Sequence, residues 1–111
     1  MKQLQTEIKE FIEQRDWQRF HSPKNLAMAL SVETAELVEI FQWLTPAQSH
    51  NVSSDTLVHI EEEIGDIMIY LTTLAAAFDL DPVSAAHKKL IKNAEKYPAK
   101  DKDASKEKNA D

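Results

Sequence analysis

The chain has 111 residues, which is enough for one domain with one small hydrophobic core. Its 19 acidic residues outnumber its 13 basic residues, and the net charge of -6 argues against binding a nucleic-acid polymer, which needs a basic surface. Cysteine is absent, the N-terminal residues have no signal-peptide apolar core, and no stretch approaches the roughly 18 apolar residues of a membrane span, so we predict a cytoplasmic protein without disulfides or membrane contact.

The predicted elements are all helices, because the chain has one glycine and no alternating strand pattern. A first helix covers about residues 4–15, with its apolar residues on one face, and a connector covers 16–22. Ser22-Pro23 is a cap followed by proline at the first helical position, and it starts a second helix. This helix continues to about Leu44 and is stopped by Thr45-Pro46.

The second half of the chain is predicted to hold two more helices. Residues 47–55 are polar and are predicted as a loop, with Ser54 or Asp55 capping a third helix over about 56–78. Asp81-Pro82 repeats the signal of a cap followed by proline and opens a fourth helix, which Pro98 ends. Residues 1–98 are therefore predicted as one all-α, four-helix-bundle-like domain. Residues 99–111 contain no apolar residue larger than alanine and are predicted as a disordered tail.

The second and third predicted helices carry more apolar residues than one buried stripe requires. A four-helix monomer would leave part of this surface in water, and large exposed apolar patches usually mark association. We therefore expect a homo-oligomer built on these two helices. The surplus apolar residues are Val32, Val38 and Phe41 on the second helix and Val58, Met68 and Ile69 on the third.

Two acidic pairs, Glu33-x-x-Glu36 and Glu63-x-x-Asp66, lie inside the two most apolar stretches of the chain. Residues three apart share a helix face, so each pair directs two carboxylates at one point. The apolar seam of the second helix lacks one member, and that position is Glu33. A buried carboxylate without a partner is costly or stays protonated, so burial here requires a partner.

A hard divalent cation is the natural partner for these acids. If the second and third helices pack antiparallel, the four carboxylates can meet and bind Mg²⁺, which takes oxygen ligands and keeps waters for substrate phosphates, with Mn²⁺ as a substitute. Such an ion lets an acidic protein bind a phosphorylated small molecule. The alternative is that these acids are solvated surface groups, but the interrupted seam favours metal. Zinc and di-iron sites are disfavoured, because no His-x-x-x-His or Glu-x-x-His spacing occurs.

Other polar residues have both a functional and an ordinary interpretation. Lys89, Asn93 and Lys96 recur at helical spacing and could meet phosphate oxygens, or form a solvated charged face. Tyr70 follows Asp66 on the same helix face. Mid-helix Gly65 either allows close packing of a neighbour, which we favour, or is incidental.

Aromatic residues could also form a slot for a nucleobase. Trp17, Phe20, His21 and Trp43 suit such a slot, although ordinary core or interface packing explains them as well.

The order of these motifs resembles a known family. The blocks are RDWQRFHSPKNL at residues 15–26, Glu33-x-x-Glu36, Phe41-Gln42-Trp43, Glu63-x-x-Asp66 and Asn93-x-x-Lys96-Tyr97-Pro98. Together they resemble the MazG-like all-α nucleoside triphosphate pyrophosphohydrolases, and most of all the dCTP pyrophosphatase branch. The resemblance covers about residues 15–98.

The resemblance implies a Mg²⁺-dependent cut between the α and β phosphates of a (deoxy)nucleoside triphosphate, dCTP-like or non-canonical, that gives a monophosphate and pyrophosphate. It implies dimers or dimers of dimers, with pockets that draw on neighbouring chains. One departure concerns Ile8, which stands where the animal dCTP enzymes have a histidine, so base selectivity is in doubt. The implied metal and catalytic residues are Glu33, Glu36, Glu63 and Asp66. The implied base-stacking residues are Trp17 and Trp43, and the implied phosphate and sugar contacts fall among Asn25, Lys89, Asn93, Lys96 and Tyr97. From their positions in the sequence we add His21 and Tyr70 to the predicted substrate-binding residues.

No residue has the setting of an activated nucleophile, so direct attack by water is the simpler mechanism, with one of the four acids or Glu39 as proton acceptor. The phosphorus that is attacked stays open. The main alternative is a non-catalytic regulatory or interaction module that retains nucleotide binding, and Glu33 argues against it, because leucine at that position would serve such a module better. A third reading is a pyrophosphohydrolase for another compound, such as a histidine-pathway nucleotide, and the blocks around Trp17 and Trp43 favour a small nucleobase instead.

Overall fold

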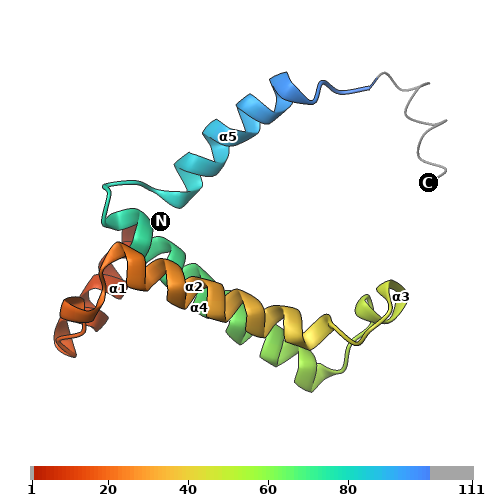
Figure 1. Cartoon of the computed structure of the whole chain (residues 1–111), viewed down its shortest axis with the longest axis horizontal. Helices are drawn as coiled ribbons and strands as arrows, with labels where there is room; N and C mark the ends of the chain where they lie inside the picture. Colours follow the sequence, from red (N-terminus) through yellow and green to blue (C-terminus); the bar gives the residue numbers. More distant parts are fainter. Residues whose placement is uncertain (1, 101–111) are drawn as a thin grey trace.

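The computed structural model describes residues 2–100, and over these residues it contains helices and no strand. Residue 1 and most of the predicted tail, residues 101–111, lie outside the described residues. The all-α prediction is confirmed, and each of the four predicted helices is present (Figure 1). The elements in chain order are α1 (Lys2–Gln14), the 3-10 helix η1 (Gln18–Phe20), α2 (Pro23–Phe41), α3 (Pro46–Ser49), α4 (Ser54–Ala76) and α5 (Pro82–Lys96).

Two helix starts follow the predicted signals. The Ser22 hydroxyl accepts the N–H of Asn25 at 3.1 Å, with proline at the next position, and α2 begins there. An Asp81 carboxylate oxygen accepts the N–H of Ser84 at 2.9 Å, and α5 begins in the same way. Each cap satisfies a backbone donor that the first helical turn would leave free.

Three boundaries differ from the prediction. Helix α2 ends at Phe41 rather than near Leu44, and Thr45-Pro46 opens the short helix α3 inside the predicted loop. Thr45 and Gln48 form a capping box, in which each side chain accepts the other's backbone N–H, at 3.1 and 2.9 Å. Helix α4 starts earlier than predicted because its cap is Ser53, rather than Ser54 or Asp55.

Helices α1 and α4 end in the same kind of turn. Asp16 and Asp79 adopt the left-handed conformation, with φ of 56° and 55°, and the N–H of the next residue reaches back to a carbonyl of the last turn. This arrangement satisfies carbonyl groups that the helix end leaves free. The two closing bonds run from Trp17 to Ile12 at 3.1 Å and from Leu80 to Ala75 at 2.9 Å.

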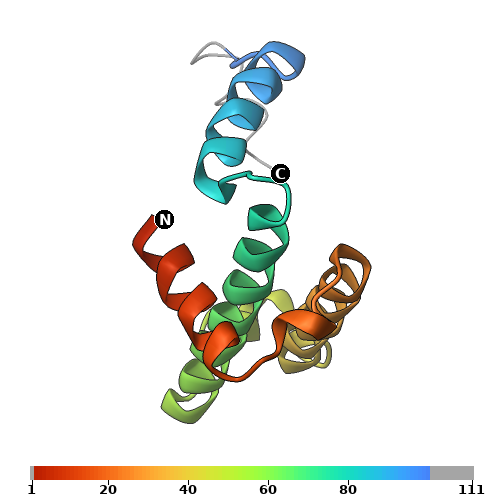
Figure 2. The same cartoon turned by 90° about the vertical axis from the view of Figure 1, so that its left-hand side faces the viewer.

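Helices α2 and α4 lie side by side and antiparallel, and α1 packs on α4 (Figures 1 and 2). The three buried hydrophobic residues of the described chain are Ile8 and Ile12 on α1 and Leu26 on α2. All three border a pocket that also contains the fully buried Thr72 of α4. The core is therefore small and sits at the end of the α2–α4 pair where α1 crosses it.

Helix α5 projects from the end of α4 and touches little else (Figures 1 and 2). The four predicted helices therefore do not close into a bundle within one chain. Val83, Leu90 and Ile91 on α5 are exposed, although an isolated helix of this length is marginal in water. Contacts within the described residues therefore contribute little to the stability of α5.

Apolar surface is also exposed on α2 and α4. Val32, Val38, Val58 and Ile69 are exposed, whereas Phe41 and Met68 are half-buried. This surface is the one from which a homo-oligomer was predicted. None of the helices within residues 2–100 is long and apolar enough to cross a membrane.

The expectation that Gly65 allows close packing is wrong within the chain. A Cβ atom added to Gly65 would meet no heavy atom within 4 Å apart from its chain neighbours and the nearby backbone of its own helix. No neighbouring helix of the same chain therefore requires a glycine at this position.

Candidate functional site

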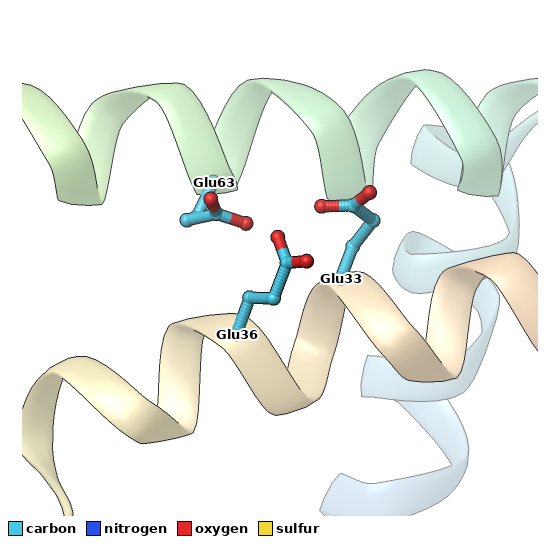
Figure 3. A group of neighbouring side chains, drawn as sticks. All are labelled: Glu33, Glu36 and Glu63. Atoms are coloured by element: carbon cyan, nitrogen blue, oxygen red, sulfur yellow. The ribbon is translucent and has the colours of Figure 1, made fainter.

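Three carboxylates converge between α2 and α4, on the facing sides of the two helices (Figure 3). Glu33 and Glu36 extend from α2 and Glu63 from α4, and one oxygen of each carboxylate lies within 4.8 Å of those of the other two. We call these residues the three-acid cluster. The antiparallel packing creates it, because it sets the two acidic pairs opposite each other.

Asp66, the fourth predicted acid, is exposed and stands outside this cluster. Its charge nevertheless acts on Glu33 and Glu63, since it contributes to raising the pKa of both carboxyl groups. Three of the four predicted acids therefore meet at one point, and the fourth, Asp66, acts on two of them through its charge.

Some buried carboxylate oxygens of the three-acid cluster have no hydrogen-bond partner. Glu63 is only 7% exposed, and Oε2 of both Glu33 and Glu63 is buried without a hydrogen-bond partner. Burial, followed by the hydrogen bond and charge of Glu36, raises the pKa of Glu33 to about 7. Burial also raises the pKa of Glu63. The protein therefore holds two carboxylates where their charged forms are disfavoured.

This donor set fits a hard divalent cation. It offers oxygen ligands only, several negative charges and buried oxygens that no group of the protein satisfies. A cation would compensate the mutual repulsion that the pKa of Glu33 records.

One basic side chain approaches the cluster among residues 2–100. Nε2 of His59 lies 3.5 Å from Oε1 of Glu63, one helical turn away on α4. His59 also borders a surface depression with Glu36, Glu39 and Thr56. Sequence reasoning missed this residue, although its position four residues before Glu63 is a readable signal.

Four of the predicted site residues border one pocket of about 440 Å³ between α1 and α4. They are Trp17, His21, Asp66 and Tyr70. Asp66 therefore borders this pocket, and its charge also acts on two acids of the three-acid cluster. The pocket volume lies in the range of small-molecule sites.

The walls of this pocket are mostly apolar and aromatic. Phe11 meets Trp17 edge to face, with ring centroids 5.6 Å apart. Ile8 also borders the pocket, and Nδ1 of His21 is buried without a hydrogen-bond partner. Sequence reasoning missed Phe11 and Glu7 as pocket residues; the amphipathic pattern of the first helix placed Phe11 only on an apolar face.

Trp43 does not join this pocket within one chain. It follows α2 and is 86% exposed, whereas Trp17 precedes α2. A helix of 19 residues is about 28 Å long, so the two indoles stand about a helix length apart. The two tryptophans of one chain cannot sandwich the same base.

The predicted phosphate and sugar contacts on α5 are also apart from the acids. Lys89, Asn93, Lys96 and Tyr97 lie on or just after α5, which projects away from the α2–α4 pair (Figure 1). Asn25 is nearer, at the start of α2, but its side-chain amide donates to the carbonyl oxygen of Phe20 at 3.0 Å. Asn25 therefore fastens η1 to α2, a structural role that the sequence did not reveal.

The sequence of the chain matches a family model whose description agrees with the all-α fold and the acidic cluster. A family model described as MazG-like matches residues 28–111. The chain belongs to the MazG-like family.

Two similar proteins belong to one branch of that family, the dCTP pyrophosphatases. The chain is similar to dCTP pyrophosphatase 1 of Homo sapiens, with 40% identity over 92 residues, 81% of this chain and 54% of the relative. It is equally similar to dCTP pyrophosphatase 1 of Bos taurus, with 40% identity over 91 residues, 80% of this chain and 54% of the relative. The chain thus spans about half the length of these relatives.

A solved structure shows the same fold over nearly its whole length. A crystal structure of a pyrophosphatase from Archaeoglobus fulgidus superposes with a TM-score of 0.84 and 40% sequence identity, covering 89% of this chain and 93% of that one. The resemblance that the ordered motifs carried is therefore confirmed at the level of the family and of the dCTP pyrophosphatase relatives.

Proposed function

We propose that this chain is a nucleoside triphosphate pyrophosphatase that depends on a divalent cation, Mg²⁺ with Mn²⁺ as a substitute. It cuts between the α and β phosphates of dCTP or a similar, non-canonical nucleotide. The observation that carries the proposal is the three-acid cluster between α2 and α4, with oxygens within 4.8 Å of one another. The names of similar proteins, dCTP pyrophosphatase and pyrophosphatase, support the same reaction.

In this proposal Glu33, Glu36, Glu63 and Asp66 hold the metal. When bound, the cation supplies neutralisation of the phosphate charge and activation of water. A water oxygen forms a new bond to phosphorus, and the P–O bond of the α–β anhydride breaks to release monophosphate and pyrophosphate. A carboxylate of the cluster, or Glu39 beside it, accepts the proton of the water.

The pocket that contains Trp17, His21 and Tyr70 is proposed to take the base. An aromatic pocket of this kind recognises a base by stacking. Asp66 lies on its border, so a base in the pocket would leave its triphosphate near the acids.

The remaining groups are proposed to come from a neighbouring copy in a homo-oligomer, a dimer or a dimer of dimers. Trp43 stands about a helix length from Trp17 of its own chain, the α5 residues project away from the α2–α4 pair, and α5 exposes apolar residues that need a partner. A second copy would place Trp43 on the base and Asn93, Lys96 and Tyr97 on phosphate and sugar, with Lys89 beside them. Asn25, from the same chain as the acids, is the last of the residues proposed to contact phosphate and sugar. The proposed partners are thus the nucleotide and further copies of the chain, with no nucleic-acid polymer and no membrane. A cytoplasmic location stays a prediction.

A non-catalytic helical module is the alternative, and the three-acid cluster counts against it. Partnerless buried carboxylates lower the stability of a fold. A module that only bound partners would gain stability from leucine at Glu33 or Glu63.

The direct test is an assay of purified protein against a panel of deoxy- and ribonucleoside triphosphates, with Mg²⁺ and with EDTA. The expected result is metal-dependent release of monophosphate and pyrophosphate in equal amounts, fastest with dCTP or a modified analogue. Release of single phosphate, or hydrolysis that survives EDTA, would contradict the proposal. Binding of nucleotide without hydrolysis would favour the non-catalytic module.

A further inference from the structure

We propose that His59 is a positioning residue for Glu63: its imidazole holds one oxygen of this carboxylate so that the other stays directed at the three-acid cluster. The inference rests on the proposed metal-dependent function and adds a residue to it. His59 would touch neither substrate nor metal.

The two oxygens of Glu63 have different surroundings. Oε1 lies 3.5 Å from Nε2 of His59, and Oε2 is buried without any hydrogen-bond partner. Figure 3 shows the Glu63 carboxylate turned toward Glu36 and Glu33. The imidazole therefore lies within ion-pair distance of one oxygen, and the second oxygen has no hydrogen-bond partner in the described part of the chain.

The need for such a contact follows from the charges around Glu63. One oxygen of Glu63 lies within 4.8 Å of oxygens of Glu33 and Glu36, so these neighbouring carboxylates repel its charged form. Repulsion favours side-chain conformations that turn the carboxylate out of the cluster. A ring nitrogen that faces Oε1 favours the conformation that keeps it in.

His59 is suited to this task by its place. It is the one basic side chain within 4 Å of a cluster carboxylate in the described part of the chain, and it lies on the same helix as Glu63. The contact is therefore made within α4 and does not require a second copy. Its side chain is 57% exposed, so its removal leaves no large cavity.

Groups that orient metal-binding side chains have measurable effects on metal affinity. Their loss typically weakens binding by about 10- to 100-fold, while the ligands themselves stay in place. Because the His59 contact is partly open to water, we expect the low end of this range. The effect should fall on metal affinity and leave turnover at saturating metal nearly unchanged.

The test compares His59→Ala, His59→Gln and His50→Ala in the full chain. Glutamine keeps an N–H donor of similar reach, and His50 is an exposed histidine away from the cluster, so its variant is the matched control. Calorimetric titration with Mn²⁺ in the absence of nucleotide measures affinity directly. The Mg²⁺ dependence of hydrolysis separates half-saturation from kcat.

The expected result is an about tenfold weaker affinity for Mn²⁺ in His59→Ala, with the same shift in the Mg²⁺ concentration for half-maximal rate and kcat within about twofold. His59→Gln should recover most of the affinity, and His50→Ala should match the wild type.

Unchanged or tighter Mn²⁺ binding in His59→Ala would overturn the positioning role. So would an equal loss in the alanine and glutamine variants, or a loss of kcat without a shift in affinity. These outcomes are distinct from failure of the proposed function, because the Mn²⁺ titration involves no substrate. A wild-type protein that binds Mn²⁺ and hydrolyses no nucleotide would refute the proposed enzymatic function. The effect of His59 on Mn²⁺ affinity could still be measured.

Discussion

The middle of the α2–α4 pair is acidic and helix α5 is basic. The two regions also differ in packing, because the acidic residues are held between two helices of one chain whereas α5 makes few contacts with the rest of it. The pair brings Glu33, Glu36 and Glu63 together within one chain and holds them by helix packing. Helix α5 carries four lysines, with Asn93 among them, and projects into solvent with its apolar side chains exposed.

This difference shows what a single copy can and cannot supply. One chain builds the acidic half of the site, which could hold a cation, because two neighbouring helices suffice to gather three carboxylates. The basic half that would meet phosphate stands apart, so in the proposed function a second copy would complete the site. The acidic half should therefore be sensitive to single substitutions, and the basic half should depend on assembly as well.

The largest expected effect is a loss of turnover when one carboxylate of the three-acid cluster is removed. Glu63→Gln keeps the shape of the side chain and removes its charge, so turnover should fall by about 100- to 1000-fold or more, with helix content unchanged by circular dichroism. Glu62→Gln, which changes an exposed neighbour, is the control and should stay active. A fully active Glu63→Gln enzyme would remove the metal assignment. Metal-free Glu63→Gln should unfold at a higher temperature than the wild type, because a buried repulsive charge is gone.

The next prediction tests whether the basic half acts in another copy. Glu63→Gln and Lys96→Ala should each be inactive or weak alone. After unfolding and refolding together in equal amounts, hybrid dimers would contain one intact site, so about a quarter of the wild-type activity should return. Light scattering should show an oligomer at the assay concentration. A fully active monomer would contradict the shared site, and an absence of rescue would place α5 on its own chain.

A smaller effect is expected at the base pocket. Trp43→Ala should raise KM by about 5- to 150-fold, which corresponds to ~1–3 kcal/mol of stacking, whereas Trp43→Phe should keep much of the affinity. Steady-state kinetics with the best triphosphate from the panel measures the change. Because Trp43 is largely exposed in the single chain, its loss should leave thermal stability nearly unchanged. An unaltered KM in Trp43→Ala would remove this residue from substrate binding.

The smallest expected effect is a pH dependence of the metal-free protein. The pKa of Glu33 rises from 4.5 to about 7 on folding, so between these values the folded state binds more protons than the unfolded state. The unfolding free energy should therefore fall as the pH rises from 4.5 to about 7, and Glu33→Gln should lack this part of the decline. Thermal unfolding in EDTA at both ends of the window measures the difference. A wild type and a variant with parallel profiles would show that Glu33 titrates normally.

Local signals in the sequence predicted the parts of the fold that local interactions determine. Ser22-Pro23 and Asp81-Pro82 start helices as expected, because a cap acts within three residues. The acid at position 33 was recognised because it interrupts an apolar seam. Thr45-Pro46 is the same kind of signal: proline there does not only end a helix, because Thr45 forms a capping box with Gln48 and opens α3.

The relations between distant residues were harder to predict. Periodicity shows which residues share a helix face, but it does not show that α5 leaves the α2–α4 pair or that Gly65 faces open space. The separation of Trp17 from Trp43 could have been derived from the length of the helix between them. The pocket that unites Trp17, His21 and Tyr70 depends on how α1 crosses α4, which no local pattern specifies.

The turn before α5 bears on how fast copies would associate. The left-handed Asp79, the bond from Leu80 to Ala75 and the Asp81 cap are all local, so the direction of α5 is set before another copy is met. Because α5 is marginal in water without a partner, docking would also have to stabilise this helix, and association should be no faster than for rigid partners, about 10⁵–10⁷ M⁻¹s⁻¹. Its lysines would be complementary to the acids of another copy, whereas the net charge of -6 on each copy opposes the encounter, so the salt dependence of the association rate would show which of the two effects dominates.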